Sequence, residues 1–369
     1  MIGTRPEAIK LAPVAHALAA RGLPPTLIVS GQHPQLDPAE FGLGELSTER
    51  LNCPGEEDPH RHVGAVAEAM VSRMSLPPDL LVVQGNTSSA LGAALAAFTN
   101  GVPVAHVEAG LRTHDPLLPW PEEEYRTAID THAELLFAPT AVAAANLQSE
   151  RVPGEVHVTG NTSIDALLAV EADLPPMSRR PSKLPRLLVT AHRRESWGEG
   201  LRSIAAALRE LASEAMIDFI LHPNAHVAAT MREALGGSAN VHLLDPCGHR
   251  ELIQHMRAAD LILSDSGGIQ EEAPALGIPL LVLRDKTERP EGVADGSAIL
   301  VGTSSVRIVA EARRLSQDAT AVDQMCERSF PYGDGKAAPR IAQIIQEWLE
   351  KRSGLSPATT DCPRQSYGW

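Results

Sequence analysis

Short apolar runs alternate with segments of helical periodicity along most of this 369-residue chain. The apolar runs are predicted to be strands, at 26–30, 80–84, 102–106, 135–138, 156–159, 186–190, 218–222, 241–244, 261–265, 280–283 and 299–301. Amphipathic segments lie between most of them, for instance at 61–74, 87–98, 200–213, 304–316 and 336–351. This alternation predicts an α/β fold in which parallel sheets are covered by helices on both faces.

The length of the chain favours two domains over one. A proline- and arginine-rich stretch at 173–186 interrupts the alternation and is the best candidate for a linker. We therefore expect two Rossmann-like, doubly wound domains at 1–172 and 187–335, with a ligand cleft between the carboxyl ends of their sheets. A final helix at 336–352 is expected to cross back to the first domain, and 353–369 resembles a loose tail.

The start of the chain is unusual, because the loop GTRPEA follows only Met1 and Ile2. We expect that the first central strand is truncated, so that either the true start lies upstream or the sequence is incomplete there. No secretory signal is recognisable at this end.

Composition argues against several classes of function. A formal net charge of −14 disfavours non-specific nucleic-acid binding, which needs a basic face. No apolar run approaches the roughly 20 residues that span a bilayer, so no membrane association is expected. The cysteines form no CxxC pair and are expected to be reduced thiols of a cytoplasmic protein. They are Cys53, Cys247, Cys326 and Cys362.

The segment SDSGGIQEEAPALG at 264–277 is the most informative motif. A strand that turns through Ser-Gly-Gly into a helix presents free backbone N–H groups and the positive end of the helix dipole, which together suit a phosphate. The glycines let the backbone approach the anion without a Cβ in the way. Glu271 and Glu272 lie where they could reach a ribose hydroxyl, so the motif suggests a nucleotide pyrophosphate.

Other predicted strand ends also carry polar side chains. GTRPEAIK (3–10) holds Arg5, which would present donors to a phosphate, and Lys10; the alternative is a capped loop with a surface arginine. In QGNTSSA (84–90), Asn86 or the following threonine could simply cap the next helix. His192, His222 and Arg289 follow three further strands, and no metal is expected because the histidine spacing matches no usual ligand pattern.

The stretch at 105–126 combines a strand end with a proline-rich loop and many ionisable groups, which is usually a functional arrangement. Its charged members include Glu108, Glu122 and Arg126. A solvated acidic start of a helix is the alternative interpretation, and it fits Glu123 and Glu124 best.

Taken together, the motifs resemble the non-hydrolysing UDP-N-acetylglucosamine 2-epimerase family, in order and over about residues 1–350. The matching segments are GTRPEAIKLAPV, GNTSSALGAALAAF, PVAHVEAGLRT, PWPEEEYR, VTGNTSIDAL, VTAHRRESWG, SDSGGIQEEAPALG, LRDKTERPEG and PYGDGKAA. The resemblance implies a GT-B-type pair of Rossmann-like domains with the active site between them, and usually a homodimer. It also implies interconversion of UDP-N-acetylglucosamine and UDP-N-acetylmannosamine without a metal or another cofactor, through elimination of UDP to a glycal and its re-addition.

The resemblance further implies roles for individual residues. Glu108 and Glu122 would be the acid/base carboxylates, and His192 a further catalytic candidate near the pyrophosphate. Leu252 stands where the family often has an aromatic residue near the uracil. The remaining residues implied in binding UDP and the sugar are Arg5, Lys10, Arg126, His222, Ser266, Gly267, Gly268, Glu272 and Arg289.

Asn86 departs from the family pattern, which has a catalytic Asp at this position. An amide cannot exchange a proton in this role, and such help is worth roughly a hundred- to ten-thousand-fold in rate. Three explanations are open: an introduced substitution, a slow epimerase that works with Glu108 and Glu122, or a chain that has diverged to another reaction or to binding alone.

A second resemblance concerns regulation. SGQHPQL (30–36) is similar to the family segment that contacts a second, activating UDP-N-acetylglucosamine, which here implicates Gln32, His33 and Gln35. The alternative is an ordinary βα loop.

Three other functions compete with the epimerase: a hydrolysing relative, a GT-B glycosyltransferase that uses the same UDP site, and a UDP-sugar sensor without turnover. The carboxylate-rich PWPEEE loop disfavours the transferase, which needs an acceptor base but not that constellation.

Overall fold

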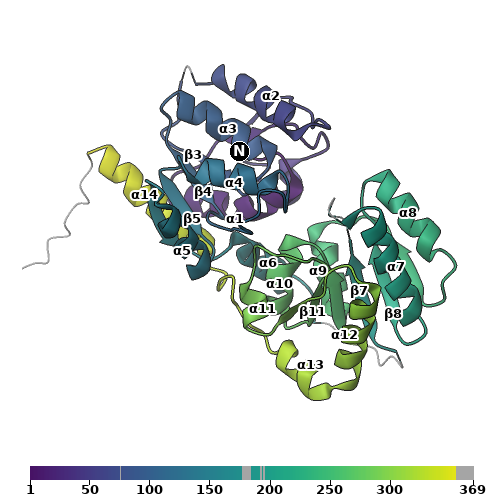
Figure 1. The fold of residues 1–369 in the computed structure, drawn as a ribbon. Helices are drawn as coiled ribbons and strands as arrows, with labels where there is room; N and C mark the ends of the chain where they lie inside the picture. Colours follow the sequence, from purple (N-terminus) through teal and green to yellow (C-terminus); the bar gives the residue numbers. More distant parts are fainter. Residues whose placement is uncertain (75, 177–183, 192, 194–195, 355–369) are drawn as a thin grey trace, which may run out of the picture.

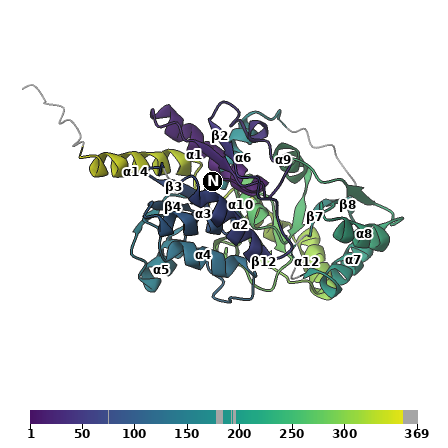
Figure 2. The same cartoon turned by 90° about the horizontal axis from the view of Figure 1, so that it is seen from above.

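The computed structural model describes residues 1–74, 76–176, 184–191, 193 and 196–354. Figures 1 and 2 show two lobes, each built around a parallel sheet, with α6 (Thr162–Ala172) and α10 (Gly267–Leu276) between them. Helix α14 (Ala337–Arg352) returns from the second lobe and packs against α1 (Arg5–Ala20) of the first. Within the described ranges, no helix combines the length and apolar character that crossing a membrane requires.

The first lobe contains a four-stranded parallel sheet in the order β3-β4-β5-β6 and a parallel pair, β1-β2. Its strands are β1 (Leu27–Val29), β2 (Thr48–Arg50), β3 (Leu81–Gln84), β4 (Val104–Val107), β5 (Leu135–Ala138) and β6 (Glu155–Val158). Its other helices are η1 (Pro38–Phe41), α2 (Pro59–Val71), α3 (Ser88–Thr99), α4 (Glu122–Asp130) and α5 (Ala141–Glu150).

The second lobe contains a six-stranded parallel sheet in the order β12-β11-β10-β7-β8-β9. Its strands are β7 (Arg186–Thr190), β8 (Met216–Ile220), β9 (Val241–Leu244), β10 (Leu261–Ser264), β11 (Leu280–Val282) and β12 (Ala298–Leu300). Its helices besides α10 are α7 (Glu199–Leu211), α8 (Ala225–Leu235), α9 (His249–Ala258), α11 (Glu291–Ala294), α12 (Ser305–Gln317) and α13 (Ala319–Cys326).

Met1 and Ile2 lie between β1 and β3. The Met1 amine donates to the Val82 carbonyl at 2.9 Å, and Ile2 forms an isolated parallel bridge with Val29. These two residues therefore make the contacts of a very short strand, beside which the four-stranded sheet and the β1-β2 pair meet.

The predicted parallel α/β architecture is confirmed by this topology. All residues of β4, β5 and β10 are buried, because helices cover both faces of the sheets, and such strands have continuous apolar sequences. β2 was not predicted, because Thr48-Glu-Arg is polar and fully exposed. The domain limits at 172 and 186 stay predictions.

Candidate active site

Charged side chains from both lobes meet where α6 contacts α10. Lys10, Glu108, Glu271, Glu288 and Arg289 are each at most 8% exposed and form one connected group of charges, which we call the ion cluster. Lys10 lies on α1 and Glu108 directly follows β4, whereas the other three belong to the second lobe. The cluster therefore joins the two lobes.

Glu108 has two cationic partners. Its Oε1 lies 2.8 Å from Lys10 Nζ and 2.8 Å from Arg289 Nη2. Asn161 Nδ2 donates to the same oxygen at 3.3 Å, and Gln84 donates to Oε2. Burial opposes ionisation, but Lys10 and Arg289 outweigh it and lower the pKa of Glu108 to about 2. The side chain is therefore a carboxylate of low basicity as long as both cations stay in place.

Glu271, on α10, faces the first lobe. It lies 3.0 Å from Lys10 and 2.6 Å from Arg289, and it accepts a 2.7 Å hydrogen bond from Ser163 on α6. Burial raises the pKa of Glu271 despite these cations. Glu271 and Glu108 share the same two cations, so that a displacement of Lys10 or Arg289 raises the pKa of both carboxyl groups.

Glu288 completes the cluster. It pairs with Arg284 at 2.9 Å and with Arg289, and Arg193 lies 3.9 Å away. Burial opposes ionisation here too, but the surrounding arginines hold the pKa of Glu288 well below its usual range. Arg193 also reaches Glu122 Oε1 at 4.0 Å, whereas Glu122 Oε2 is buried and has no hydrogen-bond partner among the described residues.

Asn86 contacts Arg126. When its amide oxygen faces the guanidinium, this oxygen accepts from Nη2 at 2.5 Å and from Nε at 3.3 Å. Arg126 is 3% exposed, and burial lowers its pKa. Its Nη1 lies 3.2 Å from Glu123 Oε2 but has no hydrogen-bond acceptor within the described part of the chain. The guanidinium thus retains a donor that an anionic or polar group could use.

The interpretation of Glu123 as part of a solvated helix start is wrong. Glu123 is 5% exposed and accepts hydrogen bonds from the backbone N–H groups of Thr113 and His114 at 2.9 and 3.0 Å. It therefore ties the proline-rich loop to α4. Glu124 is exposed, as that interpretation expects.

The motif at 264–277 folds as a strand, a turn and a helix. α10 begins at Gly267, and its N-cap residue Ser266 makes no side-chain capping bond, so that this end lacks the side-chain acceptor that usually covers a helix start. A Cβ on Gly267 would lie 2.8 Å from Arg289 Nη1. We call Ser266–Gly268 the phosphate seat; Arg289 is packed directly against it.

Glu272 also lies beside this helix, where it accepts a 2.8 Å hydrogen bond from His249 Nε2. Burial alone would lower the pKa of His249, but Glu272 raises it overall. Leu252 is partly buried on α9 against the apolar core of the second lobe. His222 follows β8, and its Nδ1 accepts from the Asn224 backbone at 3.1 Å.

The remaining predicted residues lie toward the surface or outside the described residues. Arg5 is exposed and 3.8 Å from Glu40. His33 and Gln35 are exposed, whereas Gln32 accepts a 2.6 Å hydrogen bond from Ser89. His192 lies outside the described residues.

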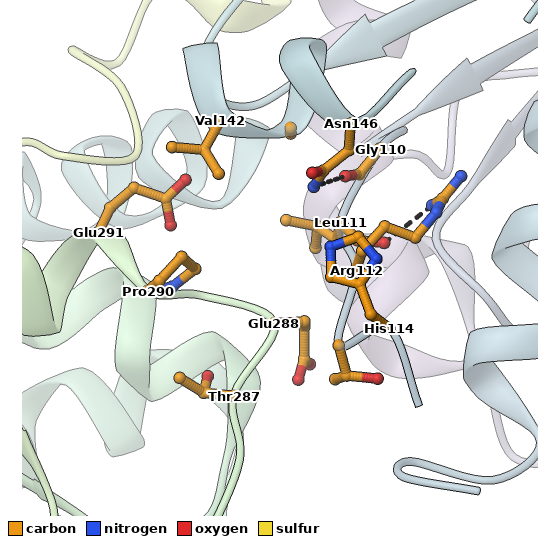
Figure 3. A pocket seen from close by; sticks show the side chains of 12 residues that line it. Gly110, Leu111, Arg112, His114, Val142, Asn146, Thr287, Glu288, Pro290 and Glu291 are labelled. Atoms are coloured by element: carbon orange, nitrogen blue, oxygen red, sulfur yellow. Dashed lines mark hydrogen bonds between the residues drawn. The ribbon is translucent and has the colours of Figure 1, made fainter. Parts of the chain in front are cut away.

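A cavity of ≈ 240 Å³ opens between the lobes, beside the loop that follows Glu108. In Figure 3, Val142, Asn146 and the 110–114 loop line one side, and Thr287, Glu288, Pro290 and Glu291 line the other. Ligand pockets commonly have volumes of roughly 300–1,000 Å³. This cavity is therefore small for a nucleotide sugar, and of the ion cluster only Glu288 lines it.

Sequence reasoning missed several buried polar residues of this region. Glu271 was considered only for a ribose, and Glu288, Ser163 and Glu7 were given no role. Glu7 is 1% exposed and accepts hydrogen bonds from Gly3, Thr4 and Thr87. Glu7, Glu271 and Glu288 lie in GTRPEAIK, IQEEA and KTERP, which also hold predicted site residues. Ser163 lies in NTSIDAL, which belongs to the segments that carry the resemblance. These positions were the available signal.

Comparison of the sequence with known proteins identifies the family of this chain. A family model described as UDP-N-acetylglucosamine 2-epimerase matches residues 16–346. The chain is 41% identical to a probable UDP-N-acetylglucosamine 2-epimerase of Ralstonia solanacearum, over 95% of this chain and 98% of that protein. It is 39% identical to the UDP-N-acetylglucosamine 2-epimerase of Escherichia coli K12, over 94% and 97%.

The fold agrees with these matches. The crystal structure of the Neisseria meningitidis UDP-GlcNAc 2-epimerase bound to UDP-GlcNAc has a TM-score of 0.88 and 36% identity, over 94% of this chain and 98% of that one. The two Rossmann-like units form the GT-B-type arrangement that the motifs predicted. With a matching family model, relatives near 40% identity and nearly complete coverage, this chain belongs to the UDP-N-acetylglucosamine 2-epimerase family of isomerases.

Proposed function

We propose that this protein interconverts UDP-N-acetylglucosamine and UDP-N-acetylmannosamine by inverting carbon 2 of the sugar. The observation that carries the proposal is the buried carboxylate of Glu108, held by Lys10 and Arg289 beside the uncapped start of α10. A base for a weakly acidic C–H group and a cationic seat for a leaving pyrophosphate thus lie together between the lobes. The relative from Neisseria meningitidis binds UDP-GlcNAc.

The reaction has two halves in this proposal. A base removes the proton from carbon 2, the electron pair forms a double bond to carbon 1, and the bond from carbon 1 to the UDP oxygen breaks. UDP then adds back to carbon 1 of the glycal, while carbon 2 receives a proton on its opposite face. Glu108 and Glu122 are the proposed proton carriers, since Glu122 has a buried carboxylate oxygen without a partner among the described residues.

The ion cluster supplies a way to activate Glu108. With Lys10 and Arg289 at 2.8 Å, its low pKa makes it a weak base. A pyrophosphate at the phosphate seat would draw both cations toward its own charges. Glu108 would then lose much of the attraction that lowers its pKa, and its basicity would rise at the moment when substrate is bound.

Asn86 limits the rate in this proposal. Its amide oxygen can orient Arg126 but cannot exchange a proton. Proton transfer therefore depends on the two glutamates, and we expect slow epimerisation. A protein that binds UDP-sugar without turnover is the second candidate function, which Asn86 favours.

Conversion is tested by NMR with UDP-N-acetylglucosamine as the only sugar. The expected result is the slow appearance of UDP-N-acetylmannosamine signals, which are lost in Glu108→Gln. Accumulation of free N-acetylmannosamine with UDP would instead indicate the hydrolysing reaction. Binding of UDP without any conversion would favour the sensor.

We further propose that Gln32, His33 and Gln35 contact a second, activating UDP-N-acetylglucosamine. Gln32 is tied to Ser89 at the start of α3, the helix that follows Asn86, so that occupancy of this loop can affect the site. UDP-N-acetylmannosamine alone should then turn over poorly until a trace of UDP-N-acetylglucosamine is added. Progress curves without a lag would contradict this regulation.

A further inference from the structure

A buried histidine next to the site has no part in the chemistry proposed so far. His106 lies on β4, two residues before Glu108, and is 0% exposed. Its Nδ1 is 2.6 Å from Asp130 Oδ1, and its Nε2 is 2.8 Å from the Gly85 carbonyl oxygen. A carbonyl oxygen can only accept, so Nε2 must carry a hydrogen.

Asp130, the last residue of α4, is held as an acceptor. It is 0% exposed, Gly110 N–H donates to its Oδ2 at 3.1 Å, and Arg112 Nη1 lies 2.8 Å from the same oxygen. Burial opposes its ionisation, but His106 and Arg112 outweigh burial and lower the pKa of Asp130. The His106 ring thus contacts a carboxylate oxygen with one nitrogen and a carbonyl oxygen with the other.

The two partners of His106 sit in the two turns that carry the proposed site. Gly85, with φ +67°, directly precedes Asn86. Asp130 holds the N–H of Gly110, and the turn that begins at Glu108 has φ values of +70° at Glu108 and +81° at Gly110. Backbone in the left-handed region is unfavourable for a glutamate and persists only where surrounding contacts hold it.

The turn at Asn86 is also held on its other side. Thr87 donates a 2.6 Å hydrogen bond to the buried carboxylate of Glu7, which accepts from Gly3 and Thr4 as well. Residue 86 is therefore fixed through both neighbours, by His106 on one side and by Glu7 on the other. An apolar residue at 106 would fill the core without the cost of burying a polar ring, so that packing alone does not account for the histidine.

We propose that His106, locked by Asp130, is a positioning residue for the reaction: it joins the Asn86 turn to the Glu108 turn and sets the spacing between Asn86 and Glu108. This inference rests on the proposed function for its kinetic consequences, but the contact itself can be tested without turnover.

Two conservative variants separate the two contacts of the ring. The amide nitrogen of asparagine lies near the place of Nδ1, so His106→Asn keeps a donor for Asp130 and loses the contact with Gly85. The amide nitrogen of glutamine lies near the place of Nε2, so His106→Gln keeps a donor for Gly85. Asparagine is also the smaller of the two, so a role confined to filling space predicts the same order of the variants. It differs in predicting faster exchange throughout the surrounding core, whereas the lost contact with Gly85 predicts a change confined to the turn at residues 85–88.

The first measurement is hydrogen–deuterium exchange at the backbone amides of residues 85–88 in the full-length protein. His106→Asn should speed exchange there, and His106→Gln should stay closer to the parent protein. The control is Val66→Ala, which removes buried methyl groups of the first lobe's core on α2, outside the two turns. Unchanged exchange at residues 85–88 in His106→Asn would overturn the inference, whether or not the protein is an epimerase.

The second measurement is the split between kcat and KM in the epimerase assay. A shift of about 1 Å in a catalytic group can cost roughly 100-fold, so kcat of His106→Asn should fall about 10- to 100-fold. KM and the affinity for UDP should change little, because the phosphate seat lies in the other lobe. His106→Gln should recover most of the loss. Equal kcat values for both variants at equal folded fractions would contradict a positioning role, whereas a parent protein without turnover would sink the proposed function alone.

Discussion

At the scale of single residues, position 86 carries an amide where the motif resemblance leads us to expect an aspartate. Asn86 lies between Gly85, whose carbonyl oxygen contacts His106, and Thr87, whose hydroxyl donates to Glu7. Its side chain contacts the buried Arg126. These contacts therefore fix the position of the side chain at residue 86. What the chain lacks there is a group that can exchange a proton.

Asn86→Asp should raise the rate of epimerisation. A carboxylate would replace the amide oxygen that lies 2.5 Å from Arg126, and general acid–base help is worth roughly 100- to 10,000-fold. Steady-state rates from NMR or a coupled assay measure the gain. Asn86→Ser is the control without a carboxylate, and an aspartate variant no faster than the serine variant would show that position 86 takes no part in proton transfer.

The pair of His249 and Glu272 should give stability a pH dependence. The folded-state pKa of His249 is raised above its ordinary value of 6.5. Its contribution to the free energy of unfolding is then complete below pH 6.5 and is lost as pH rises through the raised pKa. Urea unfolding at several pH values should show that the deficit of His249→Gln shrinks above pH 6.5. A deficit that is constant from pH 5.5 to 9 would contradict this pairing.

At the scale of elements, the sequence predicted strands well where both faces of a sheet are covered. The apolar runs at 135–138 and 186–190 match β5 and β7 residue for residue, because such strands need no polar face. The run at 241–244 also matches β9, although β9 lies at the edge of its sheet and His242 is exposed. β2 escaped prediction because its three exposed polar residues pair only through their backbone with β1. The start of α10 was predictable because glycine permits a close turn after a strand and serine is a preferred residue at the N-cap of a helix.

Gly267→Ala tests the phosphate seat. The added Cβ would lie 2.8–2.9 Å from Nη1 and Cζ of Arg289, which must move away. We expect the affinity for UDP to fall about 10-fold, since one good charged contact is worth roughly 1.5 kcal/mol or more. Calorimetry measures the affinity. The control is Gly64→Ala on α2, where no atom lies within 4 Å of the added Cβ. Equal affinity of both variants for UDP would argue against a role of Arg289 at the phosphate seat.

At the scale of the whole molecule, the two lobes meet through charges. Lys10, Glu108 and Ser163 of the first lobe contact Glu271 and Arg289 of the second. Each of the predicted residues could be found from its own motif. The contacts between these residues could not be predicted, because they depend on how the two lobes are placed relative to one another. Local sequence patterns carry no such information. The predicted homodimer stays a prediction.

Glu271→Gln should loosen this closed arrangement. The variant removes one of the two carboxylates that hold Lys10 and Arg289 between the lobes. Small-angle scattering of the ligand-free protein should show a larger radius of gyration than for the parent protein, and saturating UDP should reduce the difference. Glu251→Gln, at an exposed position of α9, is the control. Identical scattering of all three proteins would mean that the ion cluster does not hold the lobes together.

The central claim is that carbon 2 loses its proton and receives another from the protein. The most direct measurement is the incubation of the protein with UDP-N-acetylglucosamine in D₂O, followed by mass spectrometry and NMR of the recovered nucleotide sugar. We predict deuterium at carbon 2 in the product UDP-N-acetylmannosamine and, with time, in the recovered substrate, slowly for the parent protein and faster for Asn86→Asp. Only protium at carbon 2 with both proteins, after binding of UDP has been verified, would contradict it.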